Sequence, residues 1–176
     1  ILNCIGTIYV DGIRGVPLIV LAYFIYFGIP AAVKAVGFSN FKLTALVAGT
    51  ISLSMNAGAY MAEIFRAGIQ SVDKGQMEAC TTCGMTTMQG YTHVVLPQAF
   101  RLAIPSLMNN FIEYFKGSAL CSMVGVVDMM LRAKMLANKT YRFIEVYLCV
   151  LILYWLLNMI FVAIQKVIER KANAKY

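Results

Sequence analysis

Three long stretches of the chain contain no charged residue, and they constrain its fold more than any other feature. They cover residues 15–33, 43–62 and 146–164, each about 19–20 residues long. An α-helix rises about 1.5 Å per residue, so each stretch matches the roughly 30 Å hydrocarbon core of a bilayer. With their flanking residues, they predict membrane-spanning helices near residues 15–36, 43–65 and 144–165.

The composition agrees with a membrane protein. Of the 176 residues, 60% are hydrophobic and 13% are charged, whereas a soluble domain has about 45–50% and roughly 25%. These values exclude an ordinary soluble enzyme domain and a disordered chain. A net charge of +7 suits anionic lipid or an acidic partner. The sequence therefore predicts an all-α, polytopic membrane protein with a single domain over residues 1–176.

A fourth apolar region is interrupted. Residues 102–112 are uncharged, Glu113 and Lys116 follow, and residues 117–127 are again uncharged. Neither half is long enough to cross alone, so a broken span over residues 100–127 is predicted. A break at membrane depth leaves backbone groups unsatisfied unless it is buried in protein or lines a wet cavity.

The one long polar segment, residues 66–99, carries signals for two short helices. Residues 76–83 are predicted to be helical and to end at Gly84, and Thr86 is suited to cap a second helix. Pro97 fits the first turn of the long helix that follows. Short helices with few charges favour a docking element for another protein. A hairpin lying on the lipid surface is the alternative.

The spacing within this segment is similar to the EAA loop of binding-protein-dependent ABC importer permeases. That pattern reads E-A-A, three residues, G, nine residues and I-x-L-P. The chain has Glu78-Ala79-Cys80, then Gly84, then Val94-Val95-Leu96-Pro97. It departs from the pattern at Cys80, which replaces Ala, and at Val94, which replaces Ile.

The flanking segments resemble the polar amino-acid permeases of this family, the histidine, glutamate, glutamine, arginine and opine type. Residues 14–17 and 26–30 resemble RGTP and YFGLP, residues 59–71 resemble AYLAEIFRGGIQS, and residues 97–101 and 115–120 resemble PQALR and LKDTSL. Gly117 departs from the acidic residue or Asn that the family usually has there. The resemblance covers the chain from Tyr9 to the basic tail.

The resemblance implies a MetI-like type I permease core that lacks the family's first transmembrane helix. It implies a multi-pass subunit in a bacterial cell membrane that helps to import a polar amino acid. Its partners would be a dimer of ATP-binding subunits, a second permease subunit (an identical chain or a paralogue), an extracytoplasmic solute-binding protein and membrane lipid. The coupling residues would be Glu78, Ala79, Gly84, Leu96 and Pro97.

The resemblance also implies the orientation, which the nearly even distribution of basic residues leaves open. In the family the EAA loop lies in the cytoplasm, and the C-terminus would lie there too. ATP-driven closure of the ATP-binding subunits would move the loop and switch access to the pathway.

The chain has no G-x-x-x-x-G-K-[ST] phosphate-binding loop. We therefore expect no enzymatic activity and no cofactor or metal in this chain, with ATP and Mg²⁺ bound by the partner subunit. An ATP-independent channel or a secondary transporter for small polar solutes also lacks this loop and is the alternative function. The basic residues 132–142 are predicted to form a solvated loop, and no nucleic-acid partner is expected.

Polar residues in the fourth region are candidates for the translocation path, because polar groups in a membrane persist when paired, hydrated or functional. Glu113 and Lys116 are spaced to pair on one helical face and either contact the solute or form a structural ion pair. Two asparagines and a serine accompany them and either contact the solute or form interhelical hydrogen bonds. The predicted path residues are Asn109, Asn110, Glu113, Lys116 and Ser118.

Other polar residues have structural interpretations. Glu63 and Arg66 are spaced to pair where the second span enters the cytoplasm. Ser52, Ser54 and Asn56, near Gly58, are typical of a small-residue packing seam.

The Cys80-x-x-Cys83 spacing has no second ligand pair and no thioredoxin-like context, so these residues are interpreted as small helix residues. His93, the single histidine, has no plausible catalytic partner.

Overall fold

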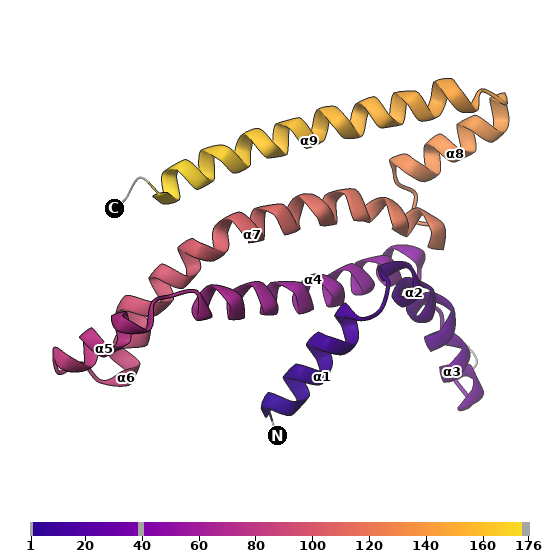
Figure 1. The fold of residues 1–176 in the computed structure, drawn as a ribbon. Coiled ribbons are helices and arrows are strands. Elements are labelled where there is room, and N and C mark those ends of the chain that lie inside the picture. The colour runs from indigo at the N-terminus through magenta and orange to yellow at the C-terminus, as the bar shows by residue number, and fades with distance from the viewer. Residues whose placement is uncertain (1, 39–40, 174–176) are drawn as a thin grey trace.

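The computed structural model describes residues 2–38 and 41–173, and every secondary-structure element in these ranges is helical. Three long helices run side by side, namely α4 (Ala45–Gln70), α7 (Leu96–Gly117) and α9 (Phe143–Asn173), as Figure 1 shows. Shorter helices lie at both ends of this layer and against the free side of α4. The predicted all-α class is confirmed.

The first predicted span is a continuous helix that contains one π-helical turn. It consists of α2 (Leu18–Tyr23), a π-helical turn η1 (Phe24–Gly28) and α3 (Ile29–Ala35). A separate helix, α1 (Leu2–Arg14), precedes it. Pro17 separates the two, with φ −58° and ψ 137°, because proline has no N–H to donate and forces the preceding residue out of the helical region.

Helix α4 is longer than the sequence predicted. It begins after Thr44, whose hydroxyl accepts a hydrogen bond from the Val47 amide at 3.3 Å, and it continues through residues 66–70. Those residues were predicted to belong to the polar loop. Arg66 bonds to Glu63 and Gln70, one turn before and one turn after it, and these i,i+3 and i,i+4 contacts favour the additional helical turn.

The break in the fourth region lies after the charged pair, which corrects the predicted position. Helix α7 passes through Glu113 and Lys116 without interruption, because the two side chains pair on an exposed face. The irregular part is the 3₁₀ helix η3 (Ser118–Val124), which ends at Gly125 with φ 94°. Glycine adopts this left-handed conformation without steric cost.

The basic segment before the last helix is helical, so the prediction of a loop over residues 132–142 was wrong. Helix α8 (Met129–Thr140) starts at Asp128, whose carboxylate accepts a hydrogen bond from the Leu131 amide at 2.8 Å. It ends at Tyr141 in the left-handed conformation, with φ 57°. This N-cap and the burial of Ala133 and Ala137 favour a helix over a loop.

Two helical segments are long and apolar enough to cross a membrane on length and composition. They are Leu18–Ala35 and Phe143–Ala172, with mean hydropathies of 1.9 and 2.4. Helix α4 has 26 residues, which is sufficient length for a span. It carries more polar side chains, including Ser52, Ser54 and Asn56.

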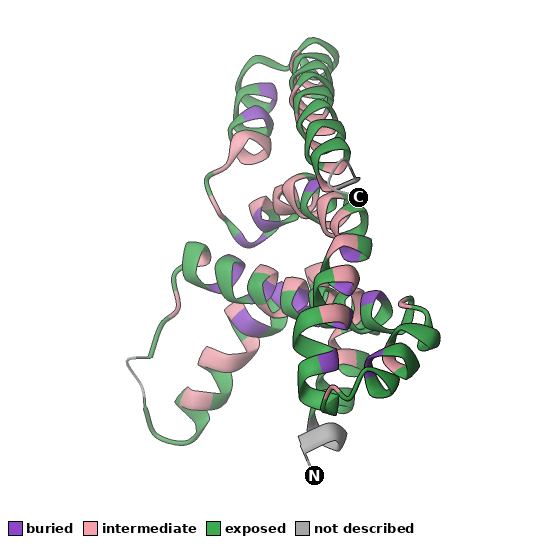
Figure 2. Ribbon diagram, turned by 90° about the vertical axis from the view of Figure 1, so that its left-hand side faces the viewer, coloured by how far each residue is buried: buried purple, intermediate pink, exposed green. Residues whose placement is uncertain are grey.

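The packed centre of the molecule is the contact between α4 and α7. On α4 the buried residues are small or polar, and they are Ala48, Gly49, Ser52, Asn56, Ala59 and Gly68. The predicted packing seam is thus confirmed at Ser52 and Asn56, whereas Ser54 and Gly58 are exposed. Helical periodicity explains the difference, because residues 52, 56 and 59 share a face that residue 54 does not. Other buried residues lie on α2, η1, η3 and α8, and Figure 2 shows buried residues on several helices.

Candidate coupling and translocation sites

A helical hairpin connects α4 to α7. It contains α5 (Lys74–Thr82), α6 (Thr87–Gly90) and the π-helical turn η2 (Tyr91–Val95). Asp73 caps α5 by accepting a hydrogen bond from the Gly75 amide at 2.7 Å. Gly84, with φ 77°, follows the end of α5, and the Met85 amide donates to the Cys80 carbonyl at 3.0 Å. The predicted role of Gly84 as a helix terminator is confirmed.

The second short helix begins with a reciprocal cap. The Gln89 amide donates to the Thr86 hydroxyl at 3.3 Å, and the Thr86 amide donates to the Gln89 side chain at 2.9 Å. The prediction that Thr86 caps a helix is confirmed. Pro97 lies in the first turn of α7, as predicted, but no loop separates α7 from the helical turn before it. Helix α6, η2 and α7 follow one another as a continuous helical path.

Small residues hold the two short helices together. Cys80 is buried against Gly90, where an added Cβ would lie 3.3 Å from the Cys80 Cβ and 2.8 Å from the Met77 sulfur. The Gln98 side chain of α7 donates to Gln76 of α5 at 3.0 Å. Cys80 is thus a small core residue of the hairpin, whereas Cys83 is exposed at the end of α5.

The five predicted coupling residues all lie on the surface of the hairpin region. Glu78 and Ala79 are exposed on α5, Gly84 is exposed at its end, and Leu96 and Pro97 are exposed at the start of α7. No atom lies within 4 Å of a Cβ built on Gly84. The hairpin therefore presents α5 outward, on a framework fixed by two caps and a small core.

His93 is occupied by local hydrogen bonds. Its Nδ1 lies 3.0 Å from the Thr92 hydroxyl and 3.1 Å from the Gln89 carbonyl oxygen. These contacts orient the ring within η2, and both partners of Nδ1 belong to the same helical turn.

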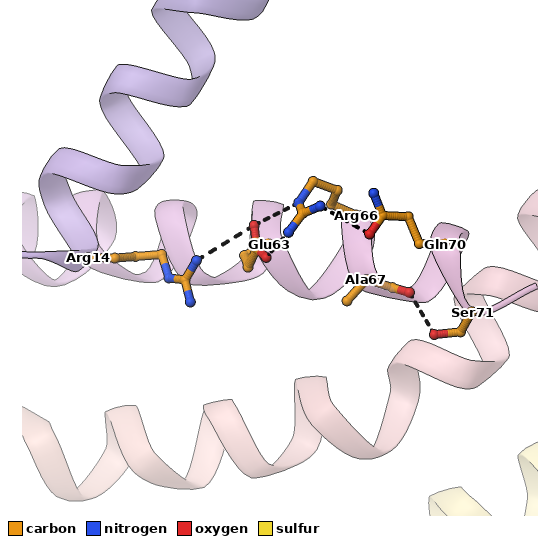
Figure 3. Close-up of polar contacts among 6 residues, drawn as sticks. All are labelled: Arg14, Glu63, Arg66, Ala67, Gln70 and Ser71. Atoms are coloured by element: carbon orange, nitrogen blue, oxygen red, sulfur yellow. Dashed lines mark hydrogen bonds and ion pairs between the residues drawn. The ribbon is translucent and has the colours of Figure 1, made fainter.

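An ion cluster joins α1 to α4 next to the hairpin (Figure 3). The Arg66 guanidinium donates to both carboxylate oxygens of Glu63, with Nε–Oε2 at 2.9 Å, and its Nη1 donates to Gln70 at 3.0 Å. The Arg14 Nη1 lies 3.6 Å from Glu63 Oε2, and its guanidinium lies over the Tyr60 ring, 5.3 Å from the centroid. The predicted Glu63–Arg66 pair is confirmed.

The third member of this cluster, Arg14, was not predicted from the sequence. Arg14 belongs to a different helix, and no local spacing connects residue 14 to residue 63. The cluster borders a cavity of about 570 Å³ between α1 and α4, whose charged lining residues are Asp11, Arg14, Glu63 and Arg66. Its walls carry charges of both signs, which suits water or a polar solute.

Four of the predicted path residues lie on two faces of α7, and the fifth, Ser118, begins η3. Asn109, Glu113 and Lys116 are exposed and spaced at i, i+4 and i+7, which places them on one face. Lys116 donates to Glu113 at 2.7 Å, and Asn109 accepts a hydrogen bond from Gln165 of α9 at 3.0 Å. The predicted pairing of Glu113 with Lys116 is confirmed, and Asn109 forms an interhelical hydrogen bond.

The remaining two residues are turned away from that face. Asn110 is half-buried, and its side-chain oxygen has no hydrogen-bond partner among the described residues. Ser118 donates to the Phe115 carbonyl within its own helical turn, at 2.8 Å. The structure therefore does not bring all five predicted path residues together.

A tyrosine that the sequence analysis missed lies in the seam near Asn110. The Tyr114 hydroxyl donates to the Asn56 side-chain oxygen of α4 at 2.8 Å, and its ring meets Tyr60 edge to face at 6.5 Å. Tyr114 is four residues after Asn110, so helical periodicity was the available signal. The seam between α4 and α7 is thus polar at this level.

Known proteins of similar sequence and structure agree on one family. Residues 1–174 match the family described as "binding-protein-dependent transport system inner membrane component". A probable amino-acid permease protein, YxeN of Bacillus subtilis, is 41% identical over 176 residues, which cover 100% of this chain and 77% of the relative.

Two solved structures are similar in fold. One, described as an amino acid ABC transporter with histidines, has a TM-score of 0.85 and 36% identity, covering 94% of this chain and 74% of its own. The second, an inward-facing MetNI methionine ABC transporter, has a TM-score of 0.65 and covers 90% of this chain and 71% of its own. Its identity is 22%, so it supports the MetI-like fold alone. The chain belongs to the family of inner membrane components of binding-protein-dependent transport systems.

Proposed function

We propose that this chain is a permease subunit of an ATP-driven importer that carries a polar amino acid across a bacterial cell membrane. Membership of the transport family and relatives named as amino-acid permeases support the substrate class. In this proposal the chain itself is not an enzyme. A dimer of partner subunits binds ATP and Mg²⁺ and hydrolyses the nucleotide, and a solute-binding protein delivers the amino acid.

The observation that carries the proposal is the capped hairpin with its outward-facing α5. Glu78 and Ala79 are exposed on this helix, and Ala79 adds little bulk, which favours close docking in a groove of the ATP-binding subunit. Because α6, η2 and α7 are continuous, a displacement of the hairpin is transmitted to α7. In the proposal this movement switches the pathway between outward and inward access.

The exposed polar face of α7 is the proposed border of the translocation path. Asn109, Glu113 and Lys116 lie on this face, and a zwitterionic amino acid carries charges opposite to those of Glu113 and Lys116. A second permease subunit, identical or paralogous, would complete the path. Asn110 and Ser118 contribute through the seam behind this face and not through direct contact with the solute.

The proposed topology is multi-pass, with the hairpin and the C-terminus in the cytoplasm. The hairpin and the C-terminal end of α9 lie toward the same end of the long helices in Figure 1, which supports a shared compartment. Helices α3 and α8 lie at the opposite end, which the proposal assigns to the extracytoplasmic side.

The coupling role is tested with Ala79→Trp in the assembled complex. An exposed helical alanine accepts a larger side chain without strain in this chain, so the substitution acts on docking. We expect ATP-driven uptake to fall by at least about tenfold, because an indole cannot enter a contact shaped for a methyl group. Uptake by reconstituted vesicles and recovery of the ATP-binding subunit are measured together.

Ala32→Trp is the matched control, since Ala32 is also exposed and helical but lies on α3. Uptake by this variant is expected to remain normal. Normal uptake by Ala79→Trp, with normal assembly, would refute the coupling role. Gly84→Trp is less informative, because a φ of 77° strains any larger residue irrespective of docking.

A further inference from the structure

Helix α5, which carries the proposed docking surface, is not continuous with α7. Its C-terminal end joins α6 through a turn at Gly84, which has a φ of 77°. Its N-terminal end follows the turn that Asp73 caps. The helix packs mainly against α6 and η2, beside which it lies in Figure 1. A movement imposed on α5 therefore reaches α7 through side-chain contacts as well as through the chain.

Two kinds of side-chain contact hold α5 in place. The first is the packing of Cys80 and Met77 against Gly90. Apolar packing has no direction, so it keeps the helices close without fixing the angle between them. The second is a hydrogen bond, which Gln98 Nε2 of α7 donates to Gln76 Oε1 of α5 at 3.0 Å. A hydrogen bond depends on direction as well as distance, so it constrains this angle.

The hydrogen bond lies at the end of α5 that is remote from the Gly84 turn. Gln76 lies six residues before Thr82, the last residue of α5, which is about 9 Å along the helix axis. Gln98 lies in the first turn of α7. A helix attached only at its C-terminal turn pivots about that turn. A second attachment near its N-terminus removes this freedom.

We propose that Gln76 and Gln98 are positioning residues for coupling, and that their hydrogen bond keeps α5 and α7 in one rigid unit throughout the transport cycle. This inference rests on the proposed function. The two glutamines act through the docking surface at Glu78 and Ala79, without contacting nucleotide or solute. When the bond is lost, a push on α5 turns that helix about Gly84, and less of the movement reaches α7. ATP is then hydrolysed without a matching amount of transport.

The chemistry of the pair provides a stringent test. A glutamine side chain donates and accepts hydrogen bonds, whereas a carboxylate only accepts them. Q76E keeps an acceptor for the Gln98 amide, and Q98E accepts from Gln76 once that amide group rotates. Q76E/Q98E has no donor and places two negative charges together. Q76E/Q98K restores an attractive pair with opposite charges.

The measurement is the number of ATP molecules hydrolysed per amino acid imported. It uses the complete complex in vesicles, with its ATP-binding subunits and solute-binding protein. The probe is whichever of radiolabelled glutamine, glutamate, histidine or arginine the unaltered complex imports fastest. We expect the ratio to stay within about twofold for each single variant and to rise at least about fivefold for Q76E/Q98E, as for the loss of one hydrogen bond. Q76E/Q98K is expected to return it to the unaltered value.

T81V is the matched control. The Thr81 hydroxyl donates to the Met77 carbonyl at 3.0 Å, so this variant removes a hydrogen bond that stays within α5. We expect an unchanged ratio. A normal ratio in Q76E/Q98E, an equal rise in T81V, or a failure of Q76E/Q98K to restore coupling would each overturn the proposal. Recovery of the ATP-binding subunit, measured in parallel, is expected to be the same for all variants.

A covalent link tests whether the two positions stay together during transport. The five native cysteines are replaced by alanine, and Q76C/Q98C is joined with a short bismaleimide. We expect a raised ratio before crosslinking, because the hydrogen bond is absent, and recovery after it. A normal ratio before crosslinking or no recovery afterwards would overturn the proposal. Absence of ATP-driven uptake by the unaltered complex would refute the proposed function itself, whereas these outcomes refute only the role of the two glutamines.

Discussion

Helices α4 and α9 are both long enough to cross a membrane, but they differ in how they are packed. Helix α4 buries six residues, which are alanines, glycines, a serine and an asparagine. Helix α9 is the more apolar helix, and none of residues 143–172 is buried. Lipid is as apolar as leucine, so hydrophobicity alone does not drive helices together in a bilayer. In this chain, burial follows small side chains and interhelical hydrogen bonds instead.

The two contacts of α7 show the same difference in atomic detail. Against α4, the backbones approach so closely that a Cβ on Gly68 would lie 2.9 Å from the Ala99 carbonyl oxygen. Against α9, aromatic rings fill the space. The centroid of the Phe161 ring lies 5.6 Å from that of Phe111 and 4.7 Å from that of Phe115. Close backbone approach tolerates little change in residue size, whereas a contact between rings and lipid-exposed side chains tolerates more.

The largest effect is expected for Gly68→Leu. The new side chain would collide with the Ala99 carbonyl and with the Ala103 Cβ, which would lie 3.2 Å from the added Cβ. We expect the free energy of unfolding in mixed micelles to fall by about 2–3 kcal/mol or more. Gly12→Leu on α1 is the control, since no atom lies within 4 Å of its added Cβ. Equal losses in the two variants would refute the close-packed seam.

A smaller loss is expected for Tyr114→Phe. It removes the 2.8 Å hydrogen bond to Asn56 and leaves that buried amide oxygen without a partner. Interhelical hydrogen bonds in membranes contribute about 1 kcal/mol, and the same denaturation measurement is expected to give this value. Tyr154→Phe on α9 removes a hydroxyl for which the structure gives no hydrogen bond. A comparable loss in that variant would mean that the Tyr114 contact is not specific.

The smallest effect is expected for Leu151→Ala on α9. This side chain is 63% exposed. In a bilayer it contacts lipid both in the folded and in the unfolded protein. We expect the free energy of unfolding of the assembled complex to change by less than about 0.5 kcal/mol. A loss of about 2 kcal/mol is typical of a buried leucine. It would show that another subunit covers this face, so that α9 would be buried in the complex as α4 is in this chain.

Much of the fold could be predicted from the sequence because the signals were local. Charge-free runs coincided with long helical segments, and Gly84 and Thr86 marked the end of one short helix and the start of the next. The Glu63–Arg66 and Glu113–Lys116 pairs followed from helical spacing. Each of these inferences needed only residues within one or two turns of each other.

The errors occurred where a contact or a cap outweighed local composition. Charges at residues 113 and 116 were expected to break a helix, but pairing on an exposed face satisfied them. The basic residues of α8 led to the prediction of a loop, but the Asp128 cap and two buried alanines stabilise a helix there. Arg14 was missed because its partner is on another helix. The sequence also did not show that Asn110 lies on a different face of α7 from Asn109, or that Ser118 begins η3.

The π-helical turn η2 sets the rotational phase between the hairpin and α7. A π turn contains one residue more than an α turn, and one residue of an α-helix corresponds to about 100° of rotation. Tyr91–Val95 therefore determines which way α5 faces relative to the polar face of α7. An insertion or deletion of a single residue there would leave both helices intact and turn them out of alignment. The length of this turn therefore fixes the angle between the hairpin and α7 as directly as a side-chain contact would.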